Sequence, residues 1–354
     1  MREIVNSRLL RGERLSFEEA IWCLTGANMW ELGRWAHHVR LRIHPPERVT
    51  YQVDRNINYS NVCISQCKFC AFYRPPGHPE GWTLTIEEIL DKVAETVQNG
   101  GTGILLQGGH NPEIPFEYYE DLLRAIRTRY PFIHIHAFSP PEISAFSRFY
   151  SMPPERILRR LIDAGLDSLP GGGAEILSDS VRKKVSPGKC SSREWLDIMR
   201  TAHKLGIKST ATMVIGLGEK PEERLKHLFT IRELQDETGG FTAFVPWSFQ
   251  KWDSRLGKGQ SSAIEYLRIQ AVARLVLDNI PHHQVSWVTQ GTQVGSLALF
   301  FGADDFSSVM MEEKVVAAAG RYDLIDESEM RRIIKALGFK PVKRLTLYQN
   351  ILHG

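Results

Sequence analysis

Three features are missing from the sequence. It has no apolar run of about 18 residues, so no membrane-spanning helix is expected. Residues 1–7 carry no apolar signal region, which predicts a protein that stays in the cytoplasm. Neither charge dominates, because 44 Lys and Arg stand against 41 Asp and Glu for a net charge of +3. That balance gives no case for nucleic acid or a membrane surface as a partner.

Cysteine is also scarce, with five in 354 residues. A secreted disulfide scaffold is dense in cysteine, so this low number predicts free thiols in a reducing compartment. Cys23 and Cys190 stand apart from the other three and are interpreted as a buried thiol and a loop thiol.

The other three cysteines, Cys63, Cys67 and Cys70, fall within eight residues in a C-x3-C-x2-C spacing. Three thiolates on one short loop suit three corners of a [4Fe–4S] cluster, whose fourth iron then lacks the cysteine that electron-transfer proteins supply. An open iron can bind a substrate or a second cofactor, as the open position of a catalytic zinc does. Zinc itself is one alternative, with His78 as a fourth ligand at an unfamiliar spacing, and free thiols are another.

Residues 1–47 are expected to form a helical arm. Ser16 begins an S-F-E-E capping sequence for a helix that runs through Cys23. A second helix is predicted from Met29 to Arg42, because the two prolines that follow at 45 and 46 stop it.

Residues 48–310 alternate between short β-like runs and amphipathic helical stretches. Eight strands are predicted, near residues 51–58, 103–107, 133–137, 168–169, 209–215, 242–246, 284–288 and 297–301. The crossovers between parallel strands are expected at residues 85–99, 116–129, 154–164, 193–205, 221–237 and 263–279. This α/β pattern predicts a TIM-like (β/α)8 barrel, with a doubly wound sheet as the alternative. Residues 311–354, with a helix at 328–336, are expected to form a helical cap.

Several predicted strands end in residues that suit a binding site. Active sites of such barrels lie at the C-terminal ends of the strands, so these loops should meet the cysteine loop at one mouth. The loops carry Gly108, Gly109 and His110 after the second strand, three glycines and Glu175 after the fourth, Trp247 after the sixth, and Thr289 and Thr292 after the seventh.

The residues alone leave the roles of these side chains open. Gly108 and Gly109 permit close approach of backbone to a ligand, or form a simple turn. Glu175 can accept hydrogen bonds from a ribose or an ammonium group, or serve a helix N-terminus. His134 and His136 lie two apart on a strand and therefore face the same side, as ligand contacts or as core histidines.

Taken together, these motifs resemble the radical S-adenosylmethionine (SAM) superfamily. The resemblance runs from the cysteine motif through residues 107–109, 136–140, 167–175 and 238–247, and covers about residues 49–310. The sequence resembles the enzymes of the futalosine route to menaquinone and of the F420 chromophore route. Its A-F-S-P and F-V-P-W stretches are most similar to the cyclic dehypoxanthinyl futalosine synthases, the dehypoxanthine futalosine cyclases. Residues 251–256 depart from the pattern of that family.

The resemblance implies two cofactors. The [4Fe–4S] cluster is held by the three cysteines, and SAM chelates its open iron through amino and carboxylate groups. Phe69, the aromatic residue before the last cysteine, fits the superfamily pattern. Gly108 and Gly109 are expected to hold the amino group of SAM through backbone carbonyls. Ser139 and Glu175 are expected to contact SAM as well.

The implied activity is that of a radical SAM cyclase, which forms a carbon–carbon bond. A 5′-deoxyadenosyl radical takes the C4′ hydrogen of the dehypoxanthine futalosine ribose, and the carbon radical adds to the benzoate ring. A base then restores aromaticity, and its candidates are His110, Tyr73 and Glu175. Electrons would come from a flavodoxin or a ferredoxin. Substrate contacts are expected from His110, Ser139, Trp247, Thr289 and Thr292, with Phe244 in an aromatic wall and Arg74 as a further donor to the carboxylate.

Two alternatives remain. A sister enzyme, an aminofutalosine synthase or an F420 chromophore synthase subunit, would use the same cluster on a different substrate. A non-catalytic iron–sulfur electron carrier would cleave no SAM and would need a fourth cysteine near the cluster.

Overall fold

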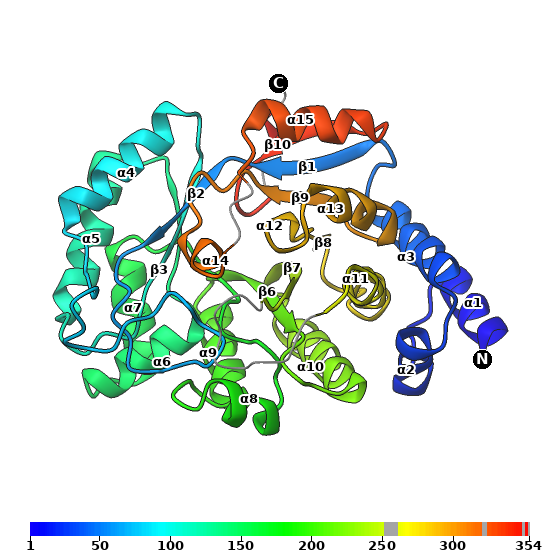
Figure 1. Cartoon of the computed structure of the whole chain (residues 1–354), viewed down its shortest axis with the longest axis horizontal. Helices are drawn as coiled ribbons and strands as arrows, with labels where there is room; N and C mark the ends of the chain where they lie inside the picture. The colour runs from blue at the N-terminus through cyan, green and yellow to red at the C-terminus, as the bar shows by residue number, and fades with distance from the viewer. Residues whose placement is uncertain (251–260, 321–323, 349–350, 353–354) are drawn as a thin grey trace.

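A computed structural model describes residues 1–250, 261–320, 324–348 and 351–352 (Figure 1). The helical arm comes first and consists of α1 (Arg2–Arg11), α2 (Phe17–Thr25) and α3 (Met29–Ile43). Ser16 and Glu19 form the capping box of α2, and Asn28 caps α3. Both helices predicted for this region are confirmed. The arm lies on the outside of the main body, where α3 packs against α11 (Ala263–Val276).

Seven parallel strands form one curled sheet in the order β2-β3-β4-β5-β6-β7-β8. Every neighbouring pair is parallel, so each strand is followed by a crossover that returns the chain to the same end. The bounds are β2 (Asp54–Asn58), β3 (Gly103–Gln107), β4 (His134–Ala137), β5 (Ser168–Leu169), β6 (Lys208–Ile215), β7 (Phe241–Ser248) and β8 (His282–His283).

An eighth strand, β9 (Asp305–Ser308), closes the ring. It pairs in parallel with β1 (Arg48–Gln52), which runs through Val53 directly into β2. On its other side an isolated bridge joins Asp305 to Gln284, just past β8. The predicted (β/α)8 barrel is thereby confirmed.

Two of the predicted strands are wrong. Residues 297–301 belong to α13 (Thr292–Ala298) and the 3-10 helix η1 (Leu299–Phe301), and residues 287–290 form α12 (Trp287–Gln290). A short apolar run does not distinguish a buried strand from a buried helical turn. Here Leu299 and Phe301 are buried beside α3 of the arm, so their apolar character serves helix packing. The actual eighth strand has the polar sequence D-F-S-S and went unrecognised.

Helices surround the sheet (Figure 1). All six predicted crossover helices are present, and their observed ends differ from the predicted ends by three residues at most. Two further helices, α6 and α8, were missed because prolines and a lysine-rich stretch hide their periodicity. The crossovers are α4 (Ile86–Gln98), α5 (Phe116–Arg129), α6 (Pro140–Phe149), α7 (Pro154–Ala164), α8 (Asp179–Val185), α9 (Ser192–Lys204), α10 (Pro221–Thr238) and α11.

The C-terminal segment contains α14 (Lys314–Ala318), α15 (Glu327–Ala336), β10 (Lys340–Arg344) and β11 (Ile351–Leu352). The helix predicted at 328–336 is confirmed. Strand β10 pairs in parallel with β1, and β11 pairs antiparallel with β10. This segment therefore adds strands as well as helices to the barrel, and the division at residues 47 and 310 stays a prediction.

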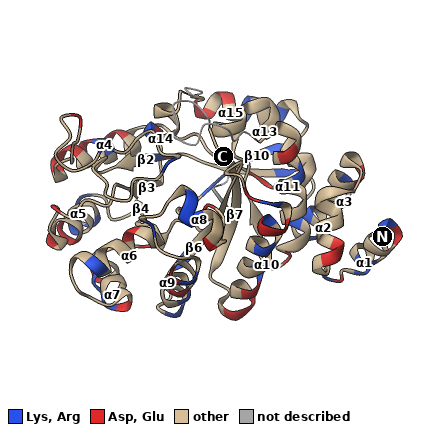
Figure 2. Cartoon of the chain, turned by 60° about the horizontal axis from the view of Figure 1, so that its bottom comes forward, with Lys and Arg blue, Asp and Glu red and all other residues tan. Residues whose placement is uncertain are grey.

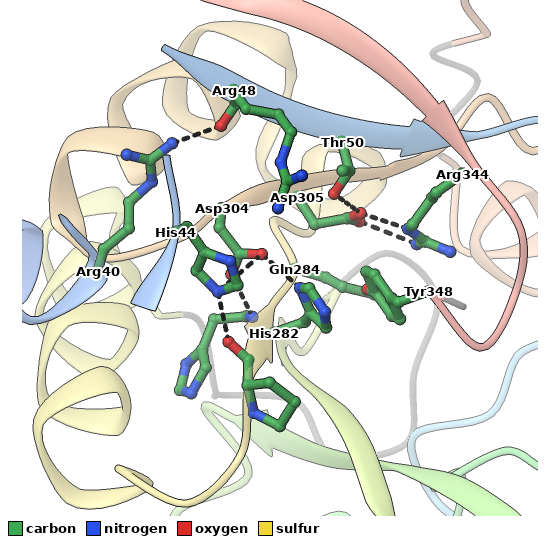
Figure 3. Close-up of polar contacts among 12 residues, drawn as sticks. Arg40, His44, Arg48, Thr50, His282, Gln284, Asp304, Asp305, Arg344 and Tyr348 are labelled. Carbon is green, nitrogen blue, oxygen red and sulfur yellow. Dashed lines mark hydrogen bonds and ion pairs between the residues drawn. The ribbon is translucent and has the colours of Figure 1, made fainter. Parts of the chain in front are cut away.

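A polar network joins the helical arm to the barrel, at the end of the barrel where the strands begin (Figure 3). Asp304 accepts hydrogen bonds from Arg274 at 2.5 Å and from His282 at 2.7 Å. His44, just after α3, lies with its Nε2 atom 2.7 Å from the carbonyl oxygen of Pro281 and 3.4 Å from Asp304. Burial alone would raise the pKa of Asp304, but these cationic and hydrogen-bonding neighbours hold it well below its usual range.

The same three groups, His44, His282 and Asp304, are residue types that ligate metals, with ligand atoms within 4.8 Å of one another. Each of these ligand atoms already has a hydrogen-bond partner within the protein. The guanidinium of Arg274 also neutralises the carboxylate. The network is therefore interpreted as a structural connection between the arm and the barrel.

The outer surface carries both charges in mixture. Figure 2 shows acidic and basic residues interspersed along the helices, in keeping with the balanced composition. Within the described part of the chain, no helix combines the length and the apolar content that crossing a bilayer requires.

Candidate active site

The cysteine loop leaves the C-terminal end of β2 and folds over the mouth of the barrel. Cys63, Cys67 and Cys70 line one cavity of about 260 Å³. Backbone hydrogen bonds hold the loop in place. The Cys63 N–H donates to the carbonyl oxygen of Arg74 at 2.8 Å, and the Lys68 N–H donates to the carbonyl oxygen of Val185 at 2.8 Å. The sequence-predicted ligands thus converge on a single space, as a shared cluster requires.

The charge in this cavity suits three thiolates. Lys189 lies with its ammonium 2.6 Å from Glu175 and 5.3 Å from the centre of the Phe69 ring. Burial alone would lower the pKa of Lys189, but the thiols of Cys67 and Cys70 together with Glu175 raise it. A buried cation beside three convergent thiols is an arrangement that fits an anionic, thiolate-bound [4Fe–4S] cluster.

Gly108 and Gly109 line the same cavity at the end of β3. A Cβ atom on Gly109 would lie 2.1 Å from the carbonyl oxygen of Val62, and one on Gly108 would lie 2.3 Å from the Tyr59 ring. The two glycines are therefore needed so that the cysteine loop can pack against β3. Contact of their carbonyls with SAM stays a prediction.

Ser139 and Glu142 also line this cavity and cap α6. The Ser139 hydroxyl donates to Glu142 at 2.6 Å, and Glu142 also accepts from the Tyr59 hydroxyl at 2.7 Å and from Gly108 N–H at 3.1 Å. Glu142 therefore connects three elements around the mouth: the end of β2, the end of β3 and the start of α6. It was missed because an acid three residues into a helix predicts only a cap.

His110 and Tyr73, two of the predicted bases, line the cysteine cavity. The Nδ1 atom of His110 lies 2.7 Å from the Ser65 hydroxyl, and burial lowers the pKa of His110 to about 3. Its imidazole is therefore neutral at physiological pH. Arg74 donates to Glu80 and to two carbonyls of its own loop, those of Ala71 and Tyr73.

A second cavity of about 260 Å³ lies inside the barrel. It shares Gln107, Gly172, Gly173 and Glu175 with the cysteine cavity, so the two spaces adjoin. The other lining residues come from both ends of the barrel and include Asp54, His136, Trp247, Gln284, Ser308 and Arg344. A substrate in this space would lie directly below a cofactor bound at the cysteines.

The predicted substrate contacts fall into two groups. Trp247 lines the barrel cavity and Ser139 lines the cysteine cavity. Thr289 is buried with its hydroxyl 2.6 Å from that of Ser286, and neither it nor Thr292 is among the described residues that line these two cavities. Phe244 is fully buried against His283, as a core residue is. Residues 251–256 lie outside the described residues.

His134 and His136 face the same side of β4, as predicted. Both place a ring nitrogen near the Ser168 hydroxyl, at 2.7 Å and 2.6 Å. His136 also lines the barrel cavity.

The charged residues Lys189, Asp54 and Arg344 were not singled out from the sequence. Lys189 stands in a polar loop, Asp54 within a strand and Arg344 near the end of the chain. Only the fold brings them to the two cavities, although the Pro-Gly-Lys-Cys stretch beside Cys190 was a signal for Lys189.

Glu175 provides a test of the cofactor site. Burial alone would raise the pKa of Glu175, but the charge of Lys189 and its hydrogen bond lower it, so the carboxylate is ionised at neutral pH. As an acceptor for SAM it should contribute one charge-assisted hydrogen bond, worth about 1.5–3 kcal/mol. Glu175→Gln should therefore weaken SAM binding about 10- to 150-fold, measured by equilibrium dialysis on cluster-loaded protein.

The matched control is Glu120→Gln. Glu120 is equally buried and lies 2.5 Å from Arg160, but it stands on the outside of the barrel. SAM affinity should not change in this variant. If SAM affinity is unchanged in Glu175→Gln, the role of Glu175 is only to form the ion pair with Lys189.

Comparisons with known proteins agree with this geometry. The model of the radical SAM superfamily matches residues 57–231, and that of the CofH/MqnC C-terminal region matches residues 238–352. The chain is 46% identical to the cyclic dehypoxanthine futalosine synthase of Halalkalibacterium halodurans, over 97% of this chain and 93% of that protein. It is 43% identical to the protein of the same name from Streptomyces coelicolor, over 98% of this chain and 88% of that protein.

A sister protein and a solved structure are also similar. The aminodeoxyfutalosine synthase of Thermus thermophilus is 39% identical over 98% of this chain and 95% of its own length. The crystal structure of the FeFe-hydrogenase maturase HydG from Carboxydothermus hydrogenoformans superposes with a TM-score of 0.77 at 19% identity, over 99% of this chain and 80% of that one. At that identity the likeness supports the fold alone.

Proposed function

The chain belongs to the radical SAM superfamily, in the family of the cyclic dehypoxanthine futalosine synthases and their sister enzymes, and from this premise we propose that it cyclises dehypoxanthine futalosine. The observation that carries the proposal is that the cavity lined by the three cysteines adjoins a second cavity inside the barrel. A radical formed at the first would meet a substrate held in the second.

When bound, the [4Fe–4S] cluster and SAM supply the 5′-deoxyadenosyl radical that takes the C4′ hydrogen of the substrate. The chain's own residues hold and orient these groups. Cys63, Cys67 and Cys70 are the ligands of the cluster, and Lys189 balances its negative charge. Phe69, Gly108, Gly109, Ser139 and Glu175 line the space for SAM.

The barrel cavity would position the substrate. Orientation supplies much of the rate in such a reaction, because the reacting atoms must be held a few ångströms apart. Trp247 offers an aromatic ring to the benzoate ring, and His136 and Gln284 line the same cavity with polar groups. The reaction is a step of menaquinone biosynthesis, with a flavodoxin or ferredoxin as electron donor and the cytoplasm as its location.

The test is isotopic. Dehypoxanthine futalosine carrying deuterium at C4′ should pass the label to 5′-deoxyadenosine when incubated anaerobically with SAM, reductant and the cluster-loaded protein. Mass spectrometry should also find the cyclic product in equal amount. The sister reaction is the competing candidate, since the aminodeoxyfutalosine synthase is 39% identical. If deoxyadenosine forms without the label, the sister reaction is the better account.

A further inference from the structure

The barrel cavity contains a carboxylic acid to which no function has been given above, Asp54. Asp54 begins β2 at the point where β1 runs into it, and it pairs in register with Gly103 of β3. Its main-chain oxygen accepts a hydrogen bond from Met311 N–H at 3.1 Å. Because the backbone is bonded to neighbours on both sides, the barrel itself sets the position of this carboxyl group.

Among the described residues that line this cavity, four side chains are titratable, and three of these are unsuited to accept a proton. Glu175 is held by Lys189, which lowers its pKa. Arg344 is a cation paired with Asp305. His136 lies near the Ser168 hydroxyl, and burial lowers its pKa to about 3.

Asp54 differs from these three. Burial raises the pKa of Asp54 to about 6, against the lowering effects of a hydrogen bond from Ser308 and of the nearby Arg344. The carboxylates of Asp305 and Glu313 add to the rise. At neutral pH the group is mostly ionised, yet it is a far stronger base than an ordinary aspartate. A general base works best when its pKa lies near the working pH.

We propose that Asp54 is the base that takes the proton from the substrate ring after the new carbon–carbon bond has formed. This inference rests on the function proposed above, because after the ring closes that reaction needs a base to remove a proton. The C–H bond of the attacked ring carbon breaks, its proton goes to the Asp54 carboxylate, and its electron pair stays in the ring. The ring must also lose one electron to regain aromaticity, and the oxidised iron–sulfur cluster, when bound, would accept it.

The position of Asp54 supports this role over the candidates drawn from the sequence. His110 and Tyr73 line the cysteine cavity, on the side where the radical forms. Asp54 lies in the barrel cavity, which is shared with Trp247 and is the space for the benzoate ring. The two steps of the reaction thus take place on opposite sides of the substrate. Hydrogen abstraction occurs at the mouth of the barrel, and proton removal occurs in its interior.

The experiment uses Asp54→Asn in the cluster-loaded enzyme with C4′-deuterated substrate. Label transfer to deoxyadenosine should remain in a single turnover, because abstraction precedes the need for a base. Cyclic product should fall about 100- to 10,000-fold, the usual contribution of a general base. Asp278→Asn, an exposed aspartate paired with Arg14, is the control and should behave as wild type.

A pH profile separates a base from a positioning residue. Wild-type turnover should rise with pH up to the pKa of Asp54 and then level off, since only the ionised form accepts a proton. Asp54→Asn should lack this rise. Ser308→Ala, which removes the hydrogen bond to the carboxylate, should move the rise to higher pH.

Three outcomes would overturn the inference. Normal product formation by Asp54→Asn is the first. A loss of label transfer together with weaker substrate binding, measured by equilibrium dialysis without SAM, is the second, and it would make Asp54 a substrate-binding residue instead. The third is a pH profile of turnover in Ser308→Ala that is the same as that of the wild type. If wild-type protein itself transfers no label, the proposed function fails rather than the role of Asp54.

Discussion

Replacing Cys67 by alanine is expected to reduce 5′-deoxyadenosine formation to the background of the protein without cluster. Cys67 is the middle ligand of the three and lines the cavity with the other two. With two thiolates left, the cluster loses a corner, and the iron that should bind SAM is no longer held in place. Deoxyadenosine measured by mass spectrometry, with iron and sulfide content per chain, gives the result.

The fold should survive this change. Cys67 is only 5% exposed, and removing one buried sulfur leaves a methyl-sized space that costs about 1 kcal/mol. Thermal unfolding of the protein without cluster should therefore change by a few degrees at most. Cys23→Ala and Cys190→Ala are matched controls, since both thiols are buried and neither is among the described residues that line the cavity. Wild-type deoxyadenosine formation in Cys67→Ala would refute the cluster assignment.

Gly109→Ala should have the second largest effect. A Cβ at this position would lie 2.1 Å from the carbonyl oxygen and 2.7 Å from the carbonyl carbon of Val62, which immediately precedes Cys63. Both contacts are to backbone, so the cysteine loop itself must shift. A displacement of about 1 Å in a catalytic arrangement costs on the order of 100-fold in rate. We expect SAM cleavage to fall by that factor, and cluster content to fall with it.

The control for this variant is Gly206→Ala. Gly206 follows α9 at a positive φ of 88°, with no atom within 4 Å of the added Cβ. Alanine at this left-handed backbone position should lower the free energy of unfolding by about 1–2 kcal/mol. SAM cleavage and cluster content should not change. If Gly109→Ala binds a full cluster and cleaves SAM at the normal rate, the close packing of the loop has no functional weight.

Local features of the sequence gave reliable predictions. Ser16 with Glu19 marked the start of α2, and the periodic stretch at 154–164 marked α7. The cysteine spacing needed no tertiary information to bring the three thiols together, because all three cysteines lie on one loop. In each case the determining interactions lie within a few residues of one another.

The failures have a different physical origin. Strand β9 carries Asp305, whose carboxylate is bonded to Thr50 and Arg344, so it is a polar strand inside the barrel and shows no apolar pattern. Lys189 and Glu175 are 14 residues apart and meet only across a cavity. Asp54 acquires its basicity from burial and from Asp305 and Glu313, which lie far away in the sequence. Such pairings depend on the completed fold.

The way in which β9 and β10 complete the barrel has a consequence for the order of events during synthesis. Strand β1 pairs with residues 305–308 on one side and 340–343 on the other, so it waits for partners made more than 250 residues later. At about 5–20 residues per second, the ribosome needs many seconds to deliver them. During that interval the cysteine loop has already emerged, while Arg344, which lines the barrel cavity, does not yet exist. The three cysteines therefore leave the ribosome before the barrel can close, and iron and sulfide have this period in which to reach them.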